Sequence, residues 1–390
     1  MQIAQVYELM NTISQEILGD SVIVQEDLSN VVELGEAFEN VGGLDNFVRS
    51  LNDHIGRVVF VNRVYGGRAP SVLMDGWEYG SILEKIRANM PEATENESWQ
   101  LQDGSSYDPN VYYKSSVSVK FFNKRVTFEI PISLTERQVK SAFSNPTQLN
   151  AFLSMIQTAI QNSMTVKLDA LIMRTINAGI GETLADAFPS GTYGSGSTTR
   201  AVNLLYLYNT TYNAGGTPLA AADALSSSDF LRFAAYQLML YSDRLEVIST
   251  LFNIEGTDKF SPKSRQKVVM LSEFKRAADV YLQSDTFHNE LTRFPASDSV
   301  TYWQGSGTGY AFADTSKINV KTPAGESVEA SGILGVIFDR DALGVANLDR
   351  RVTTNYNPKA EFWNEWHKMD SGYFLDESEN MVVFYVADAS

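Results

Sequence analysis

Apolar residues near the N-terminus recur at helical spacing. The first such pattern runs from Ile3 to Ile17, and Gly19 ends it. A second helical pattern runs from Leu44 to Ile55, after a pair of glycines. Two interpretations stay open, because the two predicted helices can pack on their own domain or form an arm that packs on a neighbouring chain.

The pattern becomes irregular between residues 56 and 110. Gly, Pro, Asp and Asn recur there, with one short helical piece predicted around Ile82 to Met90 and a polar, acidic stretch after it. A long segment with so little periodicity is unusual inside a compact domain and is typical of a functional loop. The sequence therefore predicts a projecting loop in this region.

Alternation with a period of two begins at Val111. Apolar residues fall on odd positions from Val111 to Phe121 and on even positions from Val126 to Ile132, so the register changes near Asn123. This pattern predicts two strands, joined by a turn or broken by a bulge.

The strongest local pattern predicts a long helix. Ser144 or Asn145 can cap its start, Pro146 suits its first turn, and Gly179 follows its expected end. Apolar residues hold one face between these limits, which predicts a helix at about 146–178 with a length of roughly 50 Å. This length exceeds what a compact domain of this size needs, and it suits a structural spine.

The second half of the chain alternates between strand and helix patterns. Residues 180–224 are rich in Gly, Ser, Thr and Ala and predict a boundary between domains. A capped helix in SSSDFLRFAAYQLML, followed by a buried strand and a helix in KVVMLSEFKRAADVYLQ, indicates an α/β layer. Four extended segments close the chain: GILGVIFD, ANLDRRVTTNY, AEFWNEWHKMDSGYF and MVVFYVAD.

Composition limits the classes of function that remain. With 390 residues, of which 44% are hydrophobic, the chain can bury a large core. Its net charge of -16 argues against a protein that wraps nucleic acid directly, because phosphate binding needs a concentrated basic surface. The chain has no cysteine, which excludes disulfides and thiolate chemistry. It has neither a signal-peptide pattern nor an uncharged apolar run of membrane-spanning length.

Motifs that would indicate catalysis are missing from the sequence. The three histidines, His54, His288 and His367, lie apart and lack the spacing of a zinc site, so each suits an interface or a structural role. The glycine-rich pieces GTYGSGSTTR and QGSGTGYAF match neither a phosphate-binding loop nor a dinucleotide fingerprint, and no GxSxG elbow occurs. The sequence therefore predicts no catalytic, cofactor or metal site and a protein that is not an enzyme.

The order of these parts resembles the major capsid proteins of tailed bacteriophages, which have the Hong Kong 97-type fold. Residues 117–180, which begin VSVKFFNKRVTFEI, are similar to the family's stretch that leads from the extended loop into the spine helix. Residues 335–374, which begin GVIFDRDALGVANLDRR, resemble the family's last strands. The chain is most similar to capsid proteins of small podoviruses, including the phi29-like group.

This resemblance implies an α+β chain divided into an arm, a loop and two domains. The expected divisions are an N-terminal arm at 1–55, a peripheral domain from 56–65 and 131–199 that holds the spine helix, an extended β-hairpin loop at 66–130, an axial α/β domain at 200–335, and C-terminal strands at 336–390 that return to the peripheral domain.

The resemblance also implies a function. The expected function is a major capsid protein that self-assembles into the hexamers and pentamers of an icosahedral phage head around double-stranded DNA, without sequence-specific DNA binding. A portal and a separate scaffolding protein are expected partners, because the chain starts at Met1 and has no long charged coiled coil that would act as a fused scaffold. The expected location is the virion, assembled in the host bacterial cytoplasm, with no membrane partner. Nothing in the sequence predicts covalent cross-linking between subunits.

Cations on and near the loop are the candidates for contact with acidic patches on neighbouring subunits. Alternatively, each of them is a solvated surface charge that contributes little. The candidates are Lys114, Lys120, Lys124 and Arg125 on the loop strands, and Arg57, Arg63 and Arg68 near the base of the loop.

Two other functions compete with this interpretation. An encapsulin-like compartment would share the fold and enclose enzymes, and a surface binding protein would suit the acidic, Ser/Thr/Gly-rich composition. Genes encoded beside this one would separate the first alternative from a phage capsid. The absence of an export signal counts against the second.

Overall fold

A computed structural model gives the architecture of the chain. It describes residues 3–19, 24–41, 46–48, 50, 68–74, 83–88, 91, 93, 95, 103, 104, 106, 108–114, 116–191, 193, 196–283, 297–305, 309–322, 325 and 327–388.

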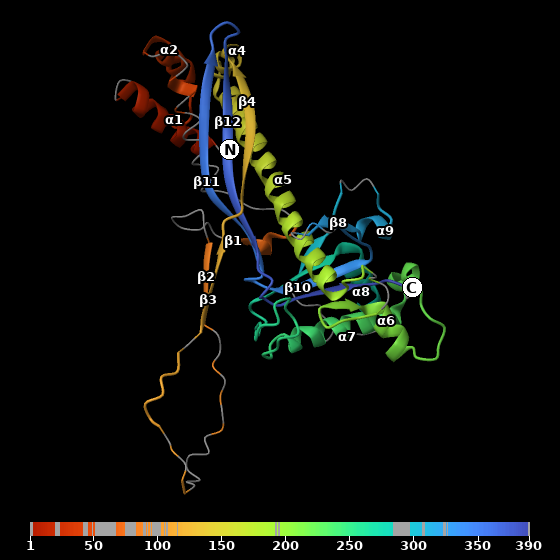
Figure 1. Ribbon diagram of the computed structural model, residues 1–390. Helices are drawn as coiled ribbons and strands as arrows, with labels where there is room; N and C mark the ends of the chain where they lie inside the picture. Colours follow the sequence, from red (N-terminus) through yellow and green to blue (C-terminus); the bar gives the residue numbers. More distant parts are fainter. Residues whose placement is uncertain are drawn as a thin grey trace.

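A long antiparallel sheet and a long helix form one end of the molecule (Figure 1). Strands β11 (Leu343–Asn357) and β12 (Phe362–Leu375) pair along their lengths, β4 (Arg125–Thr135) pairs with β12, and β1 (Leu73–Met74) adds a short parallel edge to β11. The helix α5 (Pro146–Ala187) contacts β4, β11 and β12. One face of the sheet is thus covered by α5, and the alternating exposed residues of β4 and β11 lie on the other.

The long helix begins as the sequence predicts and ends later. The Asn145 side chain accepts a hydrogen bond from the Gln148 backbone N–H at 2.8 Å, and Pro146 occupies the first turn. The helix runs through Gly179 to Ala187, 42 residues in all, so the predicted end was wrong. Gly179 lies where the Met381 and Leu375 side chains press against the helix, and an added Cβ there would lie 2.9 Å from Met381 Cε. This glycine therefore marks close packing and not a helix end.

The N-terminal helices pack on their own chain, and contact of this arm with a neighbouring chain stays a prediction. Helices α1 (Ile3–Leu18) and α2 (Val31–Val41) contact each other, and α1 also contacts α5. The ring of Phe38 in α2 packs in tilted contact with Phe47 and with Phe143, which follows α4 (Glu136–Ala142), at ring-centroid distances of 5.1 and 6.0 Å. The helix α2 was not predicted. Of the second predicted helix, residues 46–48 and 50 are helical, and its other residues lie outside the described part.

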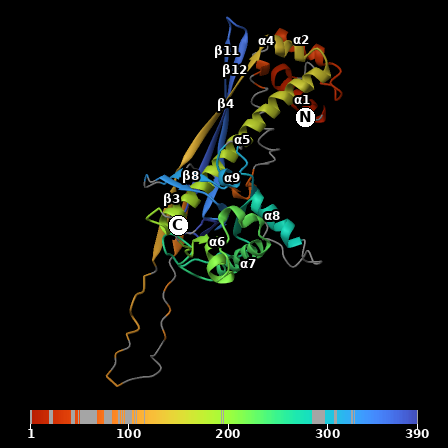
Figure 2. The same ribbon diagram turned by 90° about the vertical axis from the view of Figure 1, so that its right-hand side faces the viewer.

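A five-stranded mixed sheet forms the core of the other end, and α5 links the two ends (Figure 2). Its strand order is β5-β13-β10-β6-β7, and all seven residues of the central strand are buried. The predicted capped helix and the predicted strand-helix pair are confirmed as α7 and as β6 with α8. The elements of this end are β5 (Ala201–Asn203), α6 (Leu204–Leu207), α7 (Ser228–Arg244), β6 (Gln266–Leu271), α8 (Ser272–Gln283), β7 (Asp298–Val300), α9 (Phe312–Thr315), β10 (Ile333–Asp339), β13 (Met381–Tyr385), and the small hairpin of β8 (Ile318–Lys321) with β9 (Ser327–Ala330).

The four predicted C-terminal segments all form strands, but the structure divides them between the two sheets. Strands β11 and β12 lie in the long sheet, whereas β10 and β13 lie in the five-stranded sheet. The expectation that residues 336–390 return together to the peripheral part was therefore wrong for β13. The last strand instead joins the five-stranded sheet, against which α8 packs.

A projecting two-stranded hairpin forms the base of the predicted loop (Figure 1). Strand β2 (Leu83–Ala88) pairs antiparallel with β3 (Val117–Phe122). The short helix predicted around Ile82 to Met90 was wrong, because residues 83–88 alternate between the two faces of this hairpin. Strands β3 and β4 do not pair with each other, and the register change near Asn123 is the point where the chain leaves the hairpin and enters the long sheet.

One glycine of the five-stranded end gives a stability prediction. Gly332 has φ +79°, and a Cβ added there would lie 2.0 Å from the Val386 carbonyl oxygen. We expect Gly332→Ala to lower the free energy of unfolding by about 2 kcal/mol, through backbone strain and this clash. Urea unfolding measures the change. Gly196→Ala is the control, because no heavy atom lies within 4 Å of its added Cβ, and a loss for Gly332→Ala no larger than for this control would contradict the prediction.

Candidate functional site

The β2–β3 hairpin has two chemically different faces. Lys85 lies opposite Lys120, and both side chains are on the face that turns toward the body of the molecule. Ile86 lies opposite Val119 on the other face. Because side chains of a strand alternate, the two lysines and this apolar pair lie on opposite faces of the hairpin.

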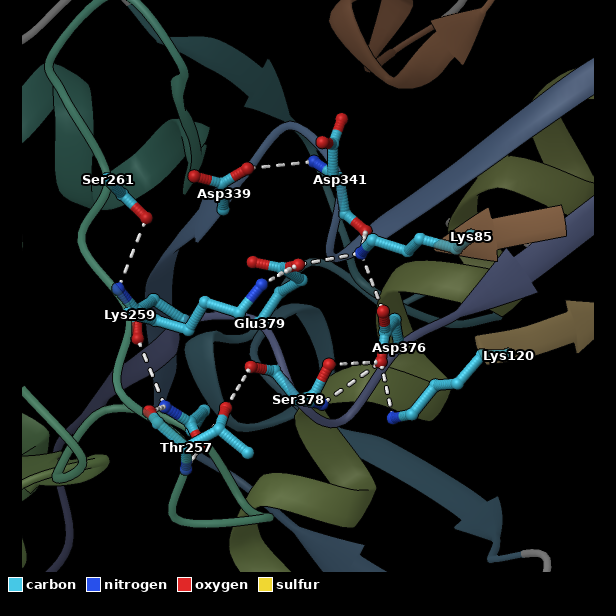
Figure 3. A network of polar contacts seen from close by, with 12 residues as sticks. Lys85, Lys120, Thr257, Lys259, Ser261, Asp339, Asp341, Asp376, Ser378 and Glu379 are labelled. Atoms are coloured by element: carbon cyan, nitrogen blue, oxygen red, sulfur yellow. Dashed lines mark hydrogen bonds and ion pairs between the residues drawn. The ribbon is translucent and has the colours of Figure 1, made fainter. Parts of the chain in front are cut away.

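The cationic face is anchored on the turn that joins β12 to β13 (Figure 3). Asp376 Oδ2 accepts a hydrogen bond from Lys85 Nζ at 2.6 Å, and Asp376 Oδ1 accepts one from Lys120 Nζ at 2.8 Å. Ser378 adds hydrogen bonds from its backbone N–H and its hydroxyl to the same Oδ1. One fully buried carboxylate thus holds both strands of the hairpin.

Further ion pairs surround this carboxylate and complete the anchor. Glu379 Oε1 lies 2.7 Å from Lys85 Nζ and 2.5 Å from Lys259 Nζ. Lys120 also pairs with Glu255, and Lys85 donates a hydrogen bond to the Asp341 carbonyl oxygen at 3.2 Å. These ion pairs join the hairpin to the 255–259 segment and to the 376–379 turn. We call the set the anchor, and its members are Lys85, Lys120, Glu255, Lys259, Asp376 and Glu379.

The charge of Asp376 depends on these partners. Burial alone raises the pKa of a carboxyl, but the hydrogen bonds from Lys120 and Lys85 outweigh it and hold the pKa of Asp376 well below its ordinary value of 3.8. A two-stranded hairpin is marginally stable by itself. The anchor, together with the ring contact between Phe122 and Phe374 at 5.4 Å, fixes the hairpin on the body.

The lowered pKa of Asp376 predicts a pH dependence. The folded-state pKa lies below the unfolded value, so the contribution of Asp376 to stability is fully present above about pH 4 and is lost as the pH falls toward the folded pKa. We expect the stability difference between the wild type and Asp376→Asn to shrink below pH 4. Urea unfolding of both proteins at pH 7, 4 and 3 measures it, and a difference that stays constant down to pH 3 would contradict the assignment.

The other face of the hairpin exposes apolar side chains to solvent. The exposed fractions are 66% for Ile86, 56% for Val117, 44% for Val119 and 64% for Phe121. Tyr112 and Tyr113, which precede β3 in the chain, are also exposed. Aromatic and aliphatic side chains gathered on a projecting element are typical of a protein interface.

A second set of polar contacts fixes the chain just before the hairpin. Arg68 donates hydrogen bonds from its backbone N–H and its Nε to Asp169 of α5, at 2.8 and 2.7 Å, and its guanidinium lies 4.7 Å from the centre of the Tyr302 ring. Ser71 donates to Asp298 of β7 from its backbone N–H at 3.0 Å. The segment that leads into β1 is thus fixed to α5 and to the five-stranded sheet.

The predicted contact cations fall into three groups in the structure. Lys120 and Arg68 have ion-pair partners within their own chain, whereas Lys114, Lys124 and Arg125 are exposed. Arg57 and Arg63 lie outside the described residues. Contact of any of these residues with a neighbouring subunit stays a prediction.

Sequence reasoning missed the acidic half of the anchor. Asp376 and Glu379 lie between the last two of the four predicted extended segments, where acidic residues are common for local reasons. Lys85 was missed because its segment was predicted as a helix. The alternation of Leu83, Lys85 and Arg87 with Glu84 and Ile86 is the signal that could have identified a two-faced strand.

Other chemistry is sparse in the described part of the chain. His367 is fully buried on β12 and lies 3.4 Å from Glu365, while His54 and His288 lie outside the described residues. Among the described residues, no group of three or more acidic or histidine side chains could hold a metal ion. None of the described helices is long and apolar enough to span a membrane.

Comparison with known families decides the identity. The family model for the Phi29-like phage major capsid protein matches residues 10–385, which is nearly the whole chain. The chain belongs to this family.

Solved phage structures share the fold of this capsid protein. A chain of the Staphylococcus phage Andhra capsid is 12% identical, with a TM-score of 0.50, and the match covers 83% of this chain and 86% of that one. A chain in the structure of the head fiber and inner core protein gp22 of native bacteriophage P68 is 11% identical, with the same TM-score and coverage. No curated protein sequence matches this chain. The capsid protein is thus a mixed α and β structure similar to phage capsid subunits.

Family membership confirms the function predicted from the sequence. The protein is a phage major capsid protein, a structural component of the virion that associates with its own copies. The encapsulin-like and surface-binding alternatives are not favoured. Phage major capsid proteins are a structural family and not an enzyme family.

Proposed function

We propose that this capsid protein builds an icosahedral phage head from hexamers and pentamers, with a Hong Kong 97-type subunit. The observation that carries the proposal is the projecting hairpin, which is anchored on one face and apolar on the other. None of the described residues covers its apolar face, since Ile86 and Phe121 stay about two-thirds exposed. If a neighbouring subunit covers the four exposed apolar side chains of this face, each contributes about 1 kcal/mol to the free energy of association.

In the proposed head, the hairpin of each subunit lies on the next subunit of the same ring. The hairpin and the surface that receives it are different, so the contact is head-to-tail and closes into rings. The five-stranded end would meet its copies around the ring centre, and the long sheet with α5 would contact neighbouring rings. Lys114, Lys124 and Arg125 are the exposed cations proposed to meet acidic patches on neighbours.

The proposed domains follow the sequence expectation except at the end of the loop and at β13, which belongs to the five-stranded sheet and not to the peripheral strands within 336–390. Residues 1–55 form the arm and residues 200–335 the axial domain, while residues 56–65 and 131–199 belong to the peripheral domain. Strand β4 is paired with β12 from Arg125 onward. This pairing favours an extended loop that ends near residue 124 instead of residue 130.

Other proposed partners follow from the same role. A separate scaffolding protein and a portal would guide assembly in the cytoplasm of the host bacterium, and the shell would enclose double-stranded DNA. The net charge of -16 supports a shell that makes only local contacts with DNA and reads no sequence. The protein would act through assembly and not as an enzyme.

Electron microscopy and sedimentation velocity test the proposal. The chain is expressed with and without its neighbouring genes, purified, and examined by negative stain and by sedimentation. We expect closed shells, or free pentamers and hexamers. A protein that stays monomeric in every condition, including co-expression with a scaffold candidate, would overturn the proposal.

A further inference from the structure

A cavity with a positive lining lies beside the base of the hairpin. It has a volume of about 270 Å³ and lies between residues 70–74, the start of β6 and the end of β10. Lys267 and Arg340 contribute its charged side chains, Phe338 and Leu343 contribute apolar surface, and no Asp or Glu lines it. The Asp298 carboxylate accepts hydrogen bonds from Ser71 at the edge of the cavity, so the two cations leave its surroundings with a net positive charge that suits an anion.

The two cations of this cavity lack a neutralising partner among the described residues. The nearby carboxylates of Asp339 and Asp341 are both paired with Arg265, with Asp339 Oδ1 at 3.1 Å from its Nη2. Neither the Lys267 side chain nor the Arg340 side chain takes part in an ion pair within the described part of the chain. Two unpaired cations beside one cavity are notable in a chain with a net charge of -16.

The same chain carries a complementary acidic stretch. Between Arg87 and Lys114 the sequence has five acidic residues and neither Lys nor Arg. Of these acids, Glu95, Asp103 and Asp108 belong to the described residues, and their side chains are exposed. Strands β2 and β3 carry the described residues of this stretch away from the body of their own subunit (Figure 1).

We propose that the cavity at Lys267 and Arg340 binds a carboxylate from the acidic loop stretch of a second copy of this chain. The inference rests on the proposed shell function and names the receiving site for the loop. The donor and the acceptor are different surfaces of one subunit, so the contact repeats head-to-tail around a ring. Charge pairs of this kind mainly set the register and the specificity of docking. The apolar hairpin face contributes most of the contact energy.

Charge reversal and charge exchange test this contact. The cavity variant combines Lys267→Glu with Arg340→Glu, and the loop variant combines Glu95→Lys, Asp103→Lys and Asp108→Lys. We expect each variant to raise the subunit concentration needed for shell formation by about tenfold. We expect the variant that carries both sets to recover most of the wild-type assembly, because the charges are exchanged and remain complementary.

Controls separate docking from folding. Arg276→Glu replaces a cation by an anion on α8, away from the cavity lining, where the Arg276 side chain is 81% exposed. We expect this variant to assemble as the wild type does. The milder pair Lys267→Gln with Arg340→Gln tests the cavity if the reversed variant fails to fold. Thermal unfolding of the unassembled subunits identifies such a failure.

The outcomes distinguish the two proposals. If the wild type forms no shells, the proposed function fails and this inference falls with it. If the wild type and the cavity variants assemble equally well, the inference alone is overturned. The inference is also overturned if inorganic phosphate stabilises the unassembled wild type but not the cavity variant, while the loop variant assembles normally, because the cavity would then bind a small free anion. The inference is supported if the cavity variant and the loop variant each assemble poorly and the variant that carries both sets of substitutions assembles well.

Discussion

Shells are expected to disappear when Val119 is replaced by aspartate, while the free subunit stays folded. Val119 lies at the middle of the apolar hairpin face and is 44% exposed in the single chain, so the subunit tolerates a polar side chain there. In a shell, the same carboxylate would be buried against the next subunit without a partner, which costs about 3 kcal/mol per contact. Electron microscopy and sedimentation velocity on Val119→Asp measure the loss.

Ser118→Asp is the matched control for this variant. Ser118 is the neighbouring residue on β3, is exposed, and lies on the opposite face of the hairpin, across from Arg87. We expect Ser118→Asp to assemble normally. Shells of normal yield from Val119→Asp would show that the apolar face is not an assembly surface.

Replacing Asp376 with asparagine is expected to lower the free energy of unfolding by about 3 kcal/mol, because it removes the negative charge that both hairpin lysines share. Lys85 keeps Glu379 and Lys120 keeps Glu255, so the loss stays at the lower end of the range for a broken buried pair. The hairpin is also expected to open more often. Urea unfolding measures the first effect, and hydrogen exchange of residues 83–88 and 117–122 measures the second.

Asp243→Asn provides the comparison for Asp376→Asn. The Asp243 carboxylate pairs with Lys263 on the surface and is 61% exposed, so its replacement is expected to change stability by no more than about 0.5 kcal/mol. Equal effects from the two substitutions, or unchanged hydrogen exchange in the hairpin, would argue against the anchor.

Local elements of this fold could be predicted from the sequence where periodicity and end signals agree. The start of α5 is an example, because Asn145 caps it and Pro146 occupies the first turn. The strand-helix pair at β6 and α8 is another, since a short apolar run is followed at once by an amphipathic pattern. These elements depend on interactions between residues a few positions apart, and the sequence records such interactions directly.

Strand partners could not be predicted in the same way. Alternation predicts β11 and β12, and short apolar runs predict β10 and β13, but each strand's neighbour is set by pairing across the chain. Strand β13 pairs with β5, about 180 residues earlier, as Val383 opposite Ala201 shows. The division of the C-terminal strands between two sheets therefore became visible only in the structure.

The anchor was hidden for a related reason. Lys120 was a candidate from the sequence, but its partner Asp376 is 256 residues away in a turn that contains two other acids. Any of these acids could have been exposed. Asp376 is buried against the lysine-bearing face of the hairpin, which strengthens its interactions with both lysines, and burial at this position depends on the whole fold.

The most direct test of the assembly account measures whether the apolar hairpin face is covered in the shell. The chain has no cysteine, so Val119→Cys introduces a single thiol that a maleimide reagent can label. Denatured shells provide the reference for complete labelling. We expect rapid labelling of free subunits and labelling at least about tenfold slower in assembled shells, because the next subunit covers the thiol. Equal labelling rates in subunits and shells would contradict the account.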